Sequence, residues 1–343
     1  MSQVVDHLAE LTGYRDRDVL DVTLVGALRE MLHPRAVAIF RCVGDAGAER
    51  WLTRARQRHD EAAASADPLW TELDTLPPVS AHPLREQCWR MGQVYAELDA
   101  VTTTCFPMST DREVAGVLEI ETDQPLSRES QQLVAGILKV YRNFLGLLDY
   151  SERDTLTGLL NRKTFDDAFL RSAAVLAPSS GSPMEGEERR HRSGAQSWLG
   201  VIDIDLFKSV NDNYGHLIGD EVLLLMSRLM RSSFRFDDRL YRFGGEEFVV
   251  LMRCADGDAA ALAFERLRHN VERHLFPQVG HITVSIGFTE LKAGDTPNGA
   301  FERADKAVYF AKGNGRNQLH HHADLVAAGH LADDAKIGDV ELF

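Results

Sequence analysis

The chain has 343 residues, a formal net charge of −14 at pH 7, and 44% hydrophobic and 26% charged residues. This length is typical of about two domains, and the acidic balance argues against nonspecific binding to nucleic acid, whose phosphates favour clustered lysine and arginine. The four cysteines show no paired spacing, and no apolar run approaches the ~20 residues that cross a bilayer. We therefore expect a cytoplasmic protein with reduced thiols and without a membrane or nucleic-acid partner.

Residues 1–128 are predicted to form a separate domain. Apolar residues recur with helical spacing over 19–31, whereas 37–42, 101–108 and 114–121 have strand-like patterns. A helix, a strand, a variable middle and two later strands before a long helix resemble a GAF sensory domain, and a PAS-like domain is the alternative. The resemblance implies an unknown small-molecule or protein signal. No cysteine or histidine stands out as an anchor, so we expect no organic cofactor.

Residues 129–153 are predicted to form a connecting signalling helix. The stretch lacks proline, and its apolar residues alternate at spacings of three and four: Val134, Ile137, Tyr141, Phe144 and Leu148. This stripe fits two structures, a helix that dimerises with a second copy or an amphipathic helix packed on its own domain. We favour the homodimer, because the reaction inferred below needs two protomers.

The segment 239–252 reads RLYRFGGEEFVVLM and predicts a β-hairpin that turns at Gly244 and Gly245. Glycine reaches the positive φ of a tight turn and lets a ligand approach the backbone. Glu246 and Glu247 follow the turn, while the apolar run 199–208, LGVIDIDLFK, carries Asp203. Acids beside buried strands repel one another and lose solvation unless a cation offsets them. If the two strands pair, Asp203 and Glu246 meet as oxygen ligands for Mg²⁺.

These segments occur in the order of a known family. DTLTGLLNR at 154–162, DIDLFKSVNDNYGHLIGD at 203–220, GGEEF, ADKAVYFAK at 304–312 and GRN at 315–317 resemble the GGDEF family of diguanylate cyclases. The resemblance implies an α/β (α+β) domain over 154–320, with a mainly antiparallel central sheet flanked by helices, of the nucleotide-cyclase or palm-like type. It also implies a reaction in which two facing domains condense two GTP into cyclic di-GMP and two pyrophosphates.

The resemblance implies a role for individual residues as well. Asp203, the carbonyl of Ile204 and Glu246 match ligands of Mg²⁺ or Mn²⁺. Glu246 also matches a proton acceptor for the 3′-hydroxyl, with Glu247 as a supporting catalytic residue. The positions that match GTP contacts are Lys208, Asn211, His216, Asp220, Gly244, Gly245, Lys312 and Arg316. Taken singly, His216 fits a helix start equally well, and each basic residue fits a solvated surface charge.

A further motif precedes the hairpin. Arg235 and Asp238 stand at the spacing of the RxxD site at which cyclic di-GMP inhibits members of the family, and Arg266 is a possible second arm. An arginine can address guanine O6 and N7 through two parallel hydrogen bonds. The alternative is a surface ion pair at a helix end, which stabilises little.

Two segments exceed what the family needs. Residues 178–197 are rich in Ser, Gly and Pro and predict a flexible loop inside the cyclase domain, and 321–343 predict a solvent-exposed tail. Two other functions fit parts of the pattern: a catalytically silent receptor for GTP or cyclic di-GMP, and a structural dimerisation module. Both are disfavoured, because neither needs a complete metal site.

Overall fold

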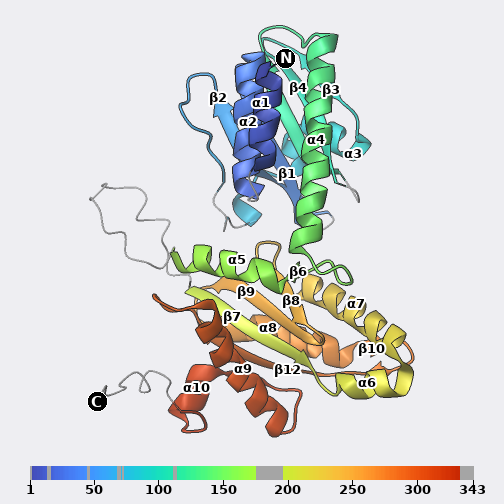
Figure 1. Cartoon of the computed structure of the whole chain (residues 1–343), viewed down its shortest axis with the longest axis vertical. Helices are drawn as coiled ribbons and strands as arrows, with labels where there is room; N and C mark the ends of the chain where they lie inside the picture. Colours follow the sequence, from blue (N-terminus) through green and yellow to red (C-terminus); the bar gives the residue numbers. More distant parts are fainter. Residues whose placement is uncertain are drawn as a thin grey trace. The chain divides into compact units, whose positions relative to one another are not determined.

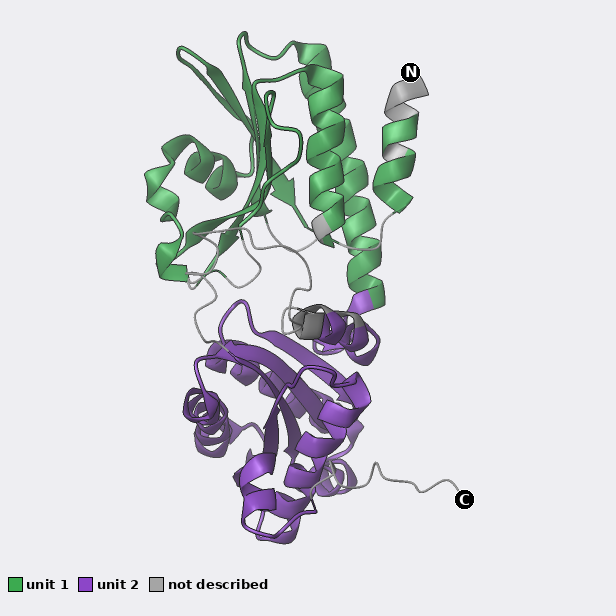
Figure 2. Ribbon diagram, turned by 90° about the vertical axis from the view of Figure 1, so that its left-hand side faces the viewer, with its two compact units in different colours: residues 1–151 green, residues 152–343 purple. Residues whose placement is uncertain are grey.

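The computed structural model describes residues 2–13, 17–44, 47–67, 71, 73–110, 114–174 and 196–332. The chain divides into two compact units, residues 1–151 and 152–343 (Figure 2). Each unit has its own sheet and its own core, in agreement with the length of the chain. Among the described residues, no helix is both long enough and apolar enough to cross a membrane.

The first unit is built on a five-stranded sheet with the order β2-β1-β5-β4-β3, in which every pairing is antiparallel. Strands β1, β4 and β5 confirm the three predicted strands. Its strands are β1 (Ala36–Val43), β2 (Arg50–Arg58), β3 (Tyr95–Leu98), β4 (Thr102–Ser109) and β5 (Val114–Thr122). Its helices are α1 (Ser2–Gly13), α2 (Arg17–Leu32), α3 (Pro83–Met91) and α4 (Arg128–Glu152), with short 3-10 turns at Leu73–Thr75 and Val79–Ala81.

Alternation along β1 assigns its side chains to two cores. Val37 and Ile39 face the larger core, which is closed by α1, α2 and α4, as Figure 1 shows. Ala38 and Phe40 face a smaller core with Cys88 of α3. Both faces of this sheet are therefore covered. The GAF-like assignment of the unit stays a prediction.

The apolar stripe of α4 corrects one expectation. Val134, Ile137, Tyr141 and Leu148 are buried in the larger core of the first unit together with Leu145, and the predicted Phe144 packs against this core half-buried. Tyr141 donates a hydrogen bond to the buried carboxylate of Asp21 on α2. The stripe is thus taken up by its own unit, as in the alternative interpretation, and α4 is part of that unit up to residue 151.

The second unit is built on a six-stranded mixed sheet with the order β13-β12-β7-β9-β8-β6. The four central strands pair antiparallel, and the short edge strands β13 and β6 pair parallel to their neighbours. Its strands are β6 (Leu160–Asn161), β7 (Gln196–Ile204), β8 (Arg239–Gly244), β9 (Glu247–Cys254), β12 (Val284–Glu290) and β13 (Leu319–His321), with β10 (Leu275–Phe276) and β11 (Gly280–His281) as a separate ribbon. Its helices are α5 (Arg162–Ala174), α6 (Phe207–Tyr214), α7 (His216–Ser233), α8 (Gly257–Arg273), α9 (Pro297–Gly313) and α10 (His322–Ala327).

Helices cover both faces of this sheet (Figure 1). Ile202 of β7 and Phe248 of β9 lie in a core with Met226 of α7 and Phe264 of α8. On the opposite face, α5 and α9 pack against the alternate residues of the same strands. The predicted antiparallel sheet flanked by helices is confirmed, with parallel edge strands added.

Close packing of α9 on β12 sets the position of the helix. A Cβ built on Gly287 would lie 2.1 Å from the carbonyl oxygen of Ala304 and 2.6 Å from the nitrogen of Val308. Only glycine therefore lets the helix backbone approach the strand this closely. The C-terminal end of α9, with Lys312, is held over the sheet near the end of β7.

The C-terminal boundary differs from the prediction. Residues 319–321 form β13 beside β12, and His322 starts α10, whose Leu325 is 5% exposed. Residues 321–327 are thus part of the domain rather than a solvent-exposed tail, and residues 333–343 lie outside the described residues. The loop predicted over 178–197 ends earlier than expected, because Gln196 and Ser197 belong to β7. Residues 178–195 lie outside the described residues.

Candidate active site

The acidic residues predicted to form a site meet where β7 and β9 pair. Asp203, one residue before the end of β7, lies opposite Glu247, and the backbone N–H of Ile204 lies 3.4 Å from the carbonyl oxygen of Glu246. Asp203 is 6% exposed. The hairpin and the strand carrying Asp203 are therefore adjacent, as the sequence predicts.

Lys312 is the cation that contacts this cluster. Its ammonium nitrogen lies 2.7 Å from Oδ1 of Asp203. Burial raises the pKa of Asp203 to about 6; Lys312 opposes this shift, whereas the charges of Glu246 and Glu247 add to it. Burial also raises the pKa of Glu246, and Lys312 again opposes the shift. One ammonium thus leaves the negative charge of this cluster only partly offset.

This arrangement fits a hard divalent cation completed by a substrate. Among the described residues, no group of three or more His, Cys, Asp or Glu side chains is placed to hold a metal ion alone. The predicted donors are two carboxylates and the carbonyl of Ile204, which is the type of partial set that Mg²⁺ completes with water and phosphate oxygens. The incompletely neutralised, buried Asp203 is the observation that favours a cation here.

The hairpin turn is held by a residue that the sequence analysis did not assign. The guanidinium of Arg242 donates to the carbonyl oxygen of Gly245 at 2.9 Å and to Asp154 at 3.0 Å. Burial raises the pKa of Asp154, but hydrogen bonds from Thr157 and Arg242 outweigh it and hold the pKa below its ordinary value. Gly245 has a φ of 36°, as the turn requires. Asp154 also accepts hydrogen bonds from the backbone N–H and the hydroxyl of Thr157, at 2.8 Å and 2.6 Å.

The residues predicted to contact guanine, Asn211 and Asp220, lie on α6 and α7, and Lys208, predicted to contact phosphate, also lies on α6. Lys208 and Asn211 are one turn apart on α6, directly after the strand end with Asp203. A Cβ on Gly219 would lie 2.1 Å from Oδ1 of Asn211, so this glycine makes room for the amide. Asp220 follows Gly219 and is exposed, as are Lys208 and His216. Asn211 and the start of α7 are thus brought together.

Arg316 lies in the turn that follows α9. It is exposed, has a φ of 61°, and its backbone N–H donates to the carbonyl oxygen of Ala311 at 2.9 Å. Lys312 and Arg316 therefore leave the same helix end, four residues apart. Two cations at such an end suit a polyphosphate.

The predicted inhibition residues also lie together. The backbone N–H of Arg235 donates to Oδ2 of Asp238 at 2.8 Å, and the Arg266 guanidinium donates to the carbonyl oxygen of Ser233 at 2.9 Å. Burial raises the pKa of Asp238 to about 7, while Arg235 and Arg266 oppose the shift. The carboxylate of Asp238 therefore closes the turn by accepting from the backbone of Arg235. The side chain of Arg235 is exposed.

Asp205 has a different role from its neighbour Asp203. Its carboxylate accepts hydrogen bonds from the hydroxyls of Thr283 and Ser285 at 2.7 Å each and from the backbone N–H of Asn317 at 3.0 Å. These donors come from the segment before β12, from β12 and from the turn after α9. Asp205 therefore fastens three segments to the strand end, a function that its sequence context did not reveal.

The second unit is similar to known proteins. Residues 151–318 match the family model "Diguanylate cyclase, GGDEF domain". The chain is 39% identical over 169 residues to diguanylate cyclase DgcP of Pseudomonas aeruginosa, covering 48% of this chain and 23% of DgcP. It is 37% identical over 221 residues to the response regulator PleD of Caulobacter vibrioides, covering 59% of this chain and 45% of PleD.

The chain thus spans less than half the length of these two relatives. Among solved structures, the GGDEF domain of DgcB from Caulobacter crescentus, crystallised with c-di-GMP, is 32% identical; the match covers 50% of this chain and 96% of that domain, with a TM-score of 0.43. The family match falls on the second unit, where the hairpin, Asp203 and Lys312 were found. Residues 151–318 of this chain are therefore a GGDEF domain, the domain of the diguanylate cyclases.

Proposed function

We propose that the chain is a diguanylate cyclase that condenses two GTP into cyclic di-GMP and two pyrophosphates, with Mg²⁺ or Mn²⁺. The observation that carries the proposal is the contact between Asp203 and Lys312 beside Glu246, at the tip of the β7–β9 pair. An acid cluster with Asp203 buried, next to an ammonium, offers carboxylates for a cation and a positive charge for phosphate. Relatives named as diguanylate cyclases share the domain.

The roles of the residues follow from their places. Asn211 and Asp220 bind guanine. The carboxylate of Asp220 accepts from N1–H and N2–H of guanine, a pattern that adenine does not offer, and the amide of Asn211 can both donate and accept. Lys312 and Arg316 bind the triphosphate. The divalent cation would be held by Asp203, Glu246 and the carbonyl of Ile204 and would neutralise charge on the phosphates.

Each bond-forming step joins a 3′-oxygen to an α-phosphorus and breaks the bond from that phosphorus to pyrophosphate. Glu246 accepts the proton of the 3′-hydroxyl; burial, which raises the pKa of Glu246, makes this carboxylate a better base. Glu247 lies opposite Asp203 and adds negative charge to the cluster rather than binding substrate itself. Arg242 keeps the turn that presents Glu246 in place.

The reaction needs two chains, because each GTP supplies the nucleophile for the other. We therefore propose a homodimer that forms through the outer face of α4, since its inner stripe packs within the first unit. Leu147 and Tyr150 on this face are 67% and 78% exposed. Apolar side chains of this size on an exposed helix face are suited to a contact with a second copy.

Regulation has two proposed sites. The first unit is a GAF-like sensor for a small molecule or protein, connected to the cyclase domain by α4. Cyclic di-GMP inhibits at Arg235, Asp238 and Arg266, which the turn after α7 and the helix α8 bring together. The exposed guanidinium of Arg235 suits the O6 and N7 atoms of a guanine.

The test is direct. Purified chain is incubated with GTP and Mg²⁺, and the products are separated by chromatography. Formation of one cyclic di-GMP for every two pyrophosphates supports the proposal. GTP binding without product under all conditions would instead favour a receptor.

A further inference from the structure

The turn after α9 has an unusual backbone. Gly315, Arg316 and Asn317 have φ values of 110°, 61° and 49°. Left-handed conformations are uncommon for residues other than glycine and persist where surrounding contacts hold them. The turn begins three residues after Lys312 and contains Arg316. Arg316 therefore depends on a backbone that must be held in place, and Lys312 lies in the last turn of α9 directly before it.

One anchor of the turn is its backbone. The N–H of Asn317 donates to Oδ2 of Asp205 at 3.0 Å. Asp205 is 5% exposed and is fixed by the hydroxyls of Thr283 and Ser285. Since Asp205 lies two residues after Asp203, this bond ties the turn to the strand end that carries the predicted metal ligand.

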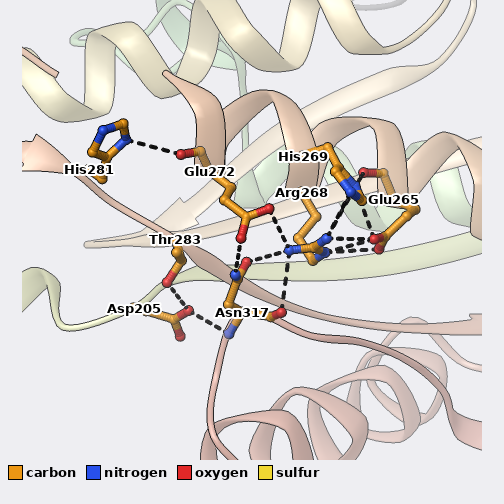
Figure 3. A network of polar contacts seen from close by, with 8 residues as sticks. All are labelled: Asp205, Glu265, Arg268, His269, Glu272, His281, Thr283 and Asn317. Atoms are coloured by element: carbon orange, nitrogen blue, oxygen red, sulfur yellow. Dashed lines mark hydrogen bonds and ion pairs between the residues drawn. The ribbon is translucent and has the colours of Figure 1, made fainter. Parts of the chain in front are cut away.

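The second anchor is the side chain of Asn317, shown in Figure 3. Its Nδ2 donates to Glu272 at 2.7 Å, and its Oδ1 accepts from Arg268 at 2.6 Å. Both partners belong to α8, and Arg268 is 9% exposed. Arg268 is itself fixed by Glu265 at 2.6 Å and by Glu272 at 3.2 Å. The amide is thus held on both of its polar atoms by a helix on the far side of the turn.

We propose that Asn317 and Arg268 are positioning residues that hold the Lys312–Arg316 turn for the triphosphate of the substrate. The inference rests on the proposed function, and it adds residues that touch no reacting atom. A turn fixed in advance lowers the entropy lost when Lys312 and Arg316 engage phosphates. The guanine contacts lie on α6 and α7, so they do not depend on this turn.

The chemistry of both residues suits this role. The amide of Asn317 donates from its nitrogen and accepts at its oxygen, whereas an aspartate in its place would face Glu272 with a second carboxylate. Only a guanidinium presents a planar fork that bonds to Glu265, Glu272 and Asn317 together; an ammonium has a compact charge without this fork. The hydrogen bond from Asn317 lowers the pKa of the Glu272 carboxyl, and the charge of Arg268 acts in the same direction.

Two substitutions separate positioning from folding. Asn317→Gly removes the amide, keeps the N–H that bonds to Asp205, and tolerates a positive φ. Arg268→Lys keeps the charge and loses the fork. Arg273→Lys is the matched control, since Arg273 is exposed on the same helix. Equilibrium binding to the full chain is measured with 3′-deoxy-GTP, which lacks the attacking hydroxyl, and with 3′-deoxy-GMP.

We expect the ratio of triphosphate to monophosphate affinity to fall about tenfold in Asn317→Gly and Arg268→Lys, with monophosphate affinity unchanged. Arg273→Lys should keep the wild-type ratio. An unchanged ratio in both folded variants overturns the inference. A purely structural role would give this result through an equal loss of affinity for both nucleotides.

Hydrogen exchange of the ligand-free chain supplies a second readout. Amides of residues 313–318 should exchange faster in both variants than in wild type and in Arg273→Lys, and unchanged exchange would refute the anchoring. A wild type that binds no triphosphate refutes the proposed function, and this result is distinct from either outcome for the turn.

Discussion

The ammonium of Lys312 lies 2.7 Å from Oδ1 of Asp203 and joins the end of α9 to the end of β7. Asp203 is buried, whereas the side chain of Lys312 is 34% exposed. The pair is therefore neither a fully solvated surface bridge nor a fully buried one. It joins the acidic site to the C-terminal end of α9.

Lys312→Gln should destabilise the ligand-free chain, because it leaves a buried carboxylate beside Glu246 without its ammonium. The expected loss is ~1 kcal/mol, reduced from that of a fully buried pair by the partial exposure of Lys312. Thermal unfolding of Lys312→Gln, Asp203→Asn and the double variant completes a double-mutant cycle. Additive effects of the two substitutions would show that the pair does not couple α9 to β7.

Arg235→Ala should retain cyclase activity and lose inhibition by product, since Arg235 lies outside the Asp203–Glu246 site. Initial rates are measured at increasing cyclic di-GMP, and the inhibition constant should rise at least about tenfold, as expected for loss of a bidentate contact to guanine. Arg228→Ala is the control, because Arg228 is exposed on α7. An unchanged inhibition constant in Arg235→Ala would favour a ligand-free turn.

Asp238 gives a prediction for pH. Burial raises its folded-state pKa to about 7, above the ordinary value of an aspartate. The folded state therefore binds the proton more tightly, so the contribution of Asp238 to stability is complete below the unfolded pKa and is lost as pH rises through about 7. Asp238→Asn keeps the acceptor for Arg235 but does not titrate.

Relative to wild type, Asp238→Asn should thus gain stability between pH 5 and pH 8, values chosen on either side of the folded pKa of about 7. Unfolding midpoints in urea at both pH values measure this difference. A difference between the two proteins that stays constant with pH would contradict the assignment.

The C-terminal helix α10 should contribute to folding. Leu325 is 5% exposed, so Leu325→Ala should destabilise the second unit by about 2–4 kcal/mol, as for other buried leucines. Leu262→Ala removes the same atoms from a side chain that is 71% exposed and serves as the control. Equal unfolding midpoints for the two variants would mean that α10 is not part of the folded domain.

The local parts of the site could be predicted from the sequence. Alternating apolar runs and the Gly244–Gly245 pair specify the β8–β9 hairpin, and acids in an apolar run mark Asp203. Contacts between distant segments could not be predicted, because no local pattern shows that Lys312 reaches Asp203 or that Arg268 reaches Asn317. Strand β2 was missed for another reason: its sequence, RWLTRARQR, is rich in arginine, and only a few of its residues are buried.

The stripe on α4 shows a different limit. Spacings of three and four are the same for a coiled coil and for an amphipathic helix on its own domain, so only the surrounding core could decide between them. The C-terminal segment was misjudged because it exceeds what the family needs, and its contacts with the sheet are not visible in a local pattern. In the structure His321 stacks on Phe288, and His322 is buried.

The central claim is tested most directly by Glu246→Gln in the product assay, beside wild type and the control Glu302→Gln, whose residue is exposed on α9. With GTP and Mg²⁺, wild type and Glu302→Gln should form cyclic di-GMP, and Glu246→Gln should form at least about 100-fold less while it unfolds at the wild-type temperature. Undiminished turnover in Glu246→Gln would contradict the account.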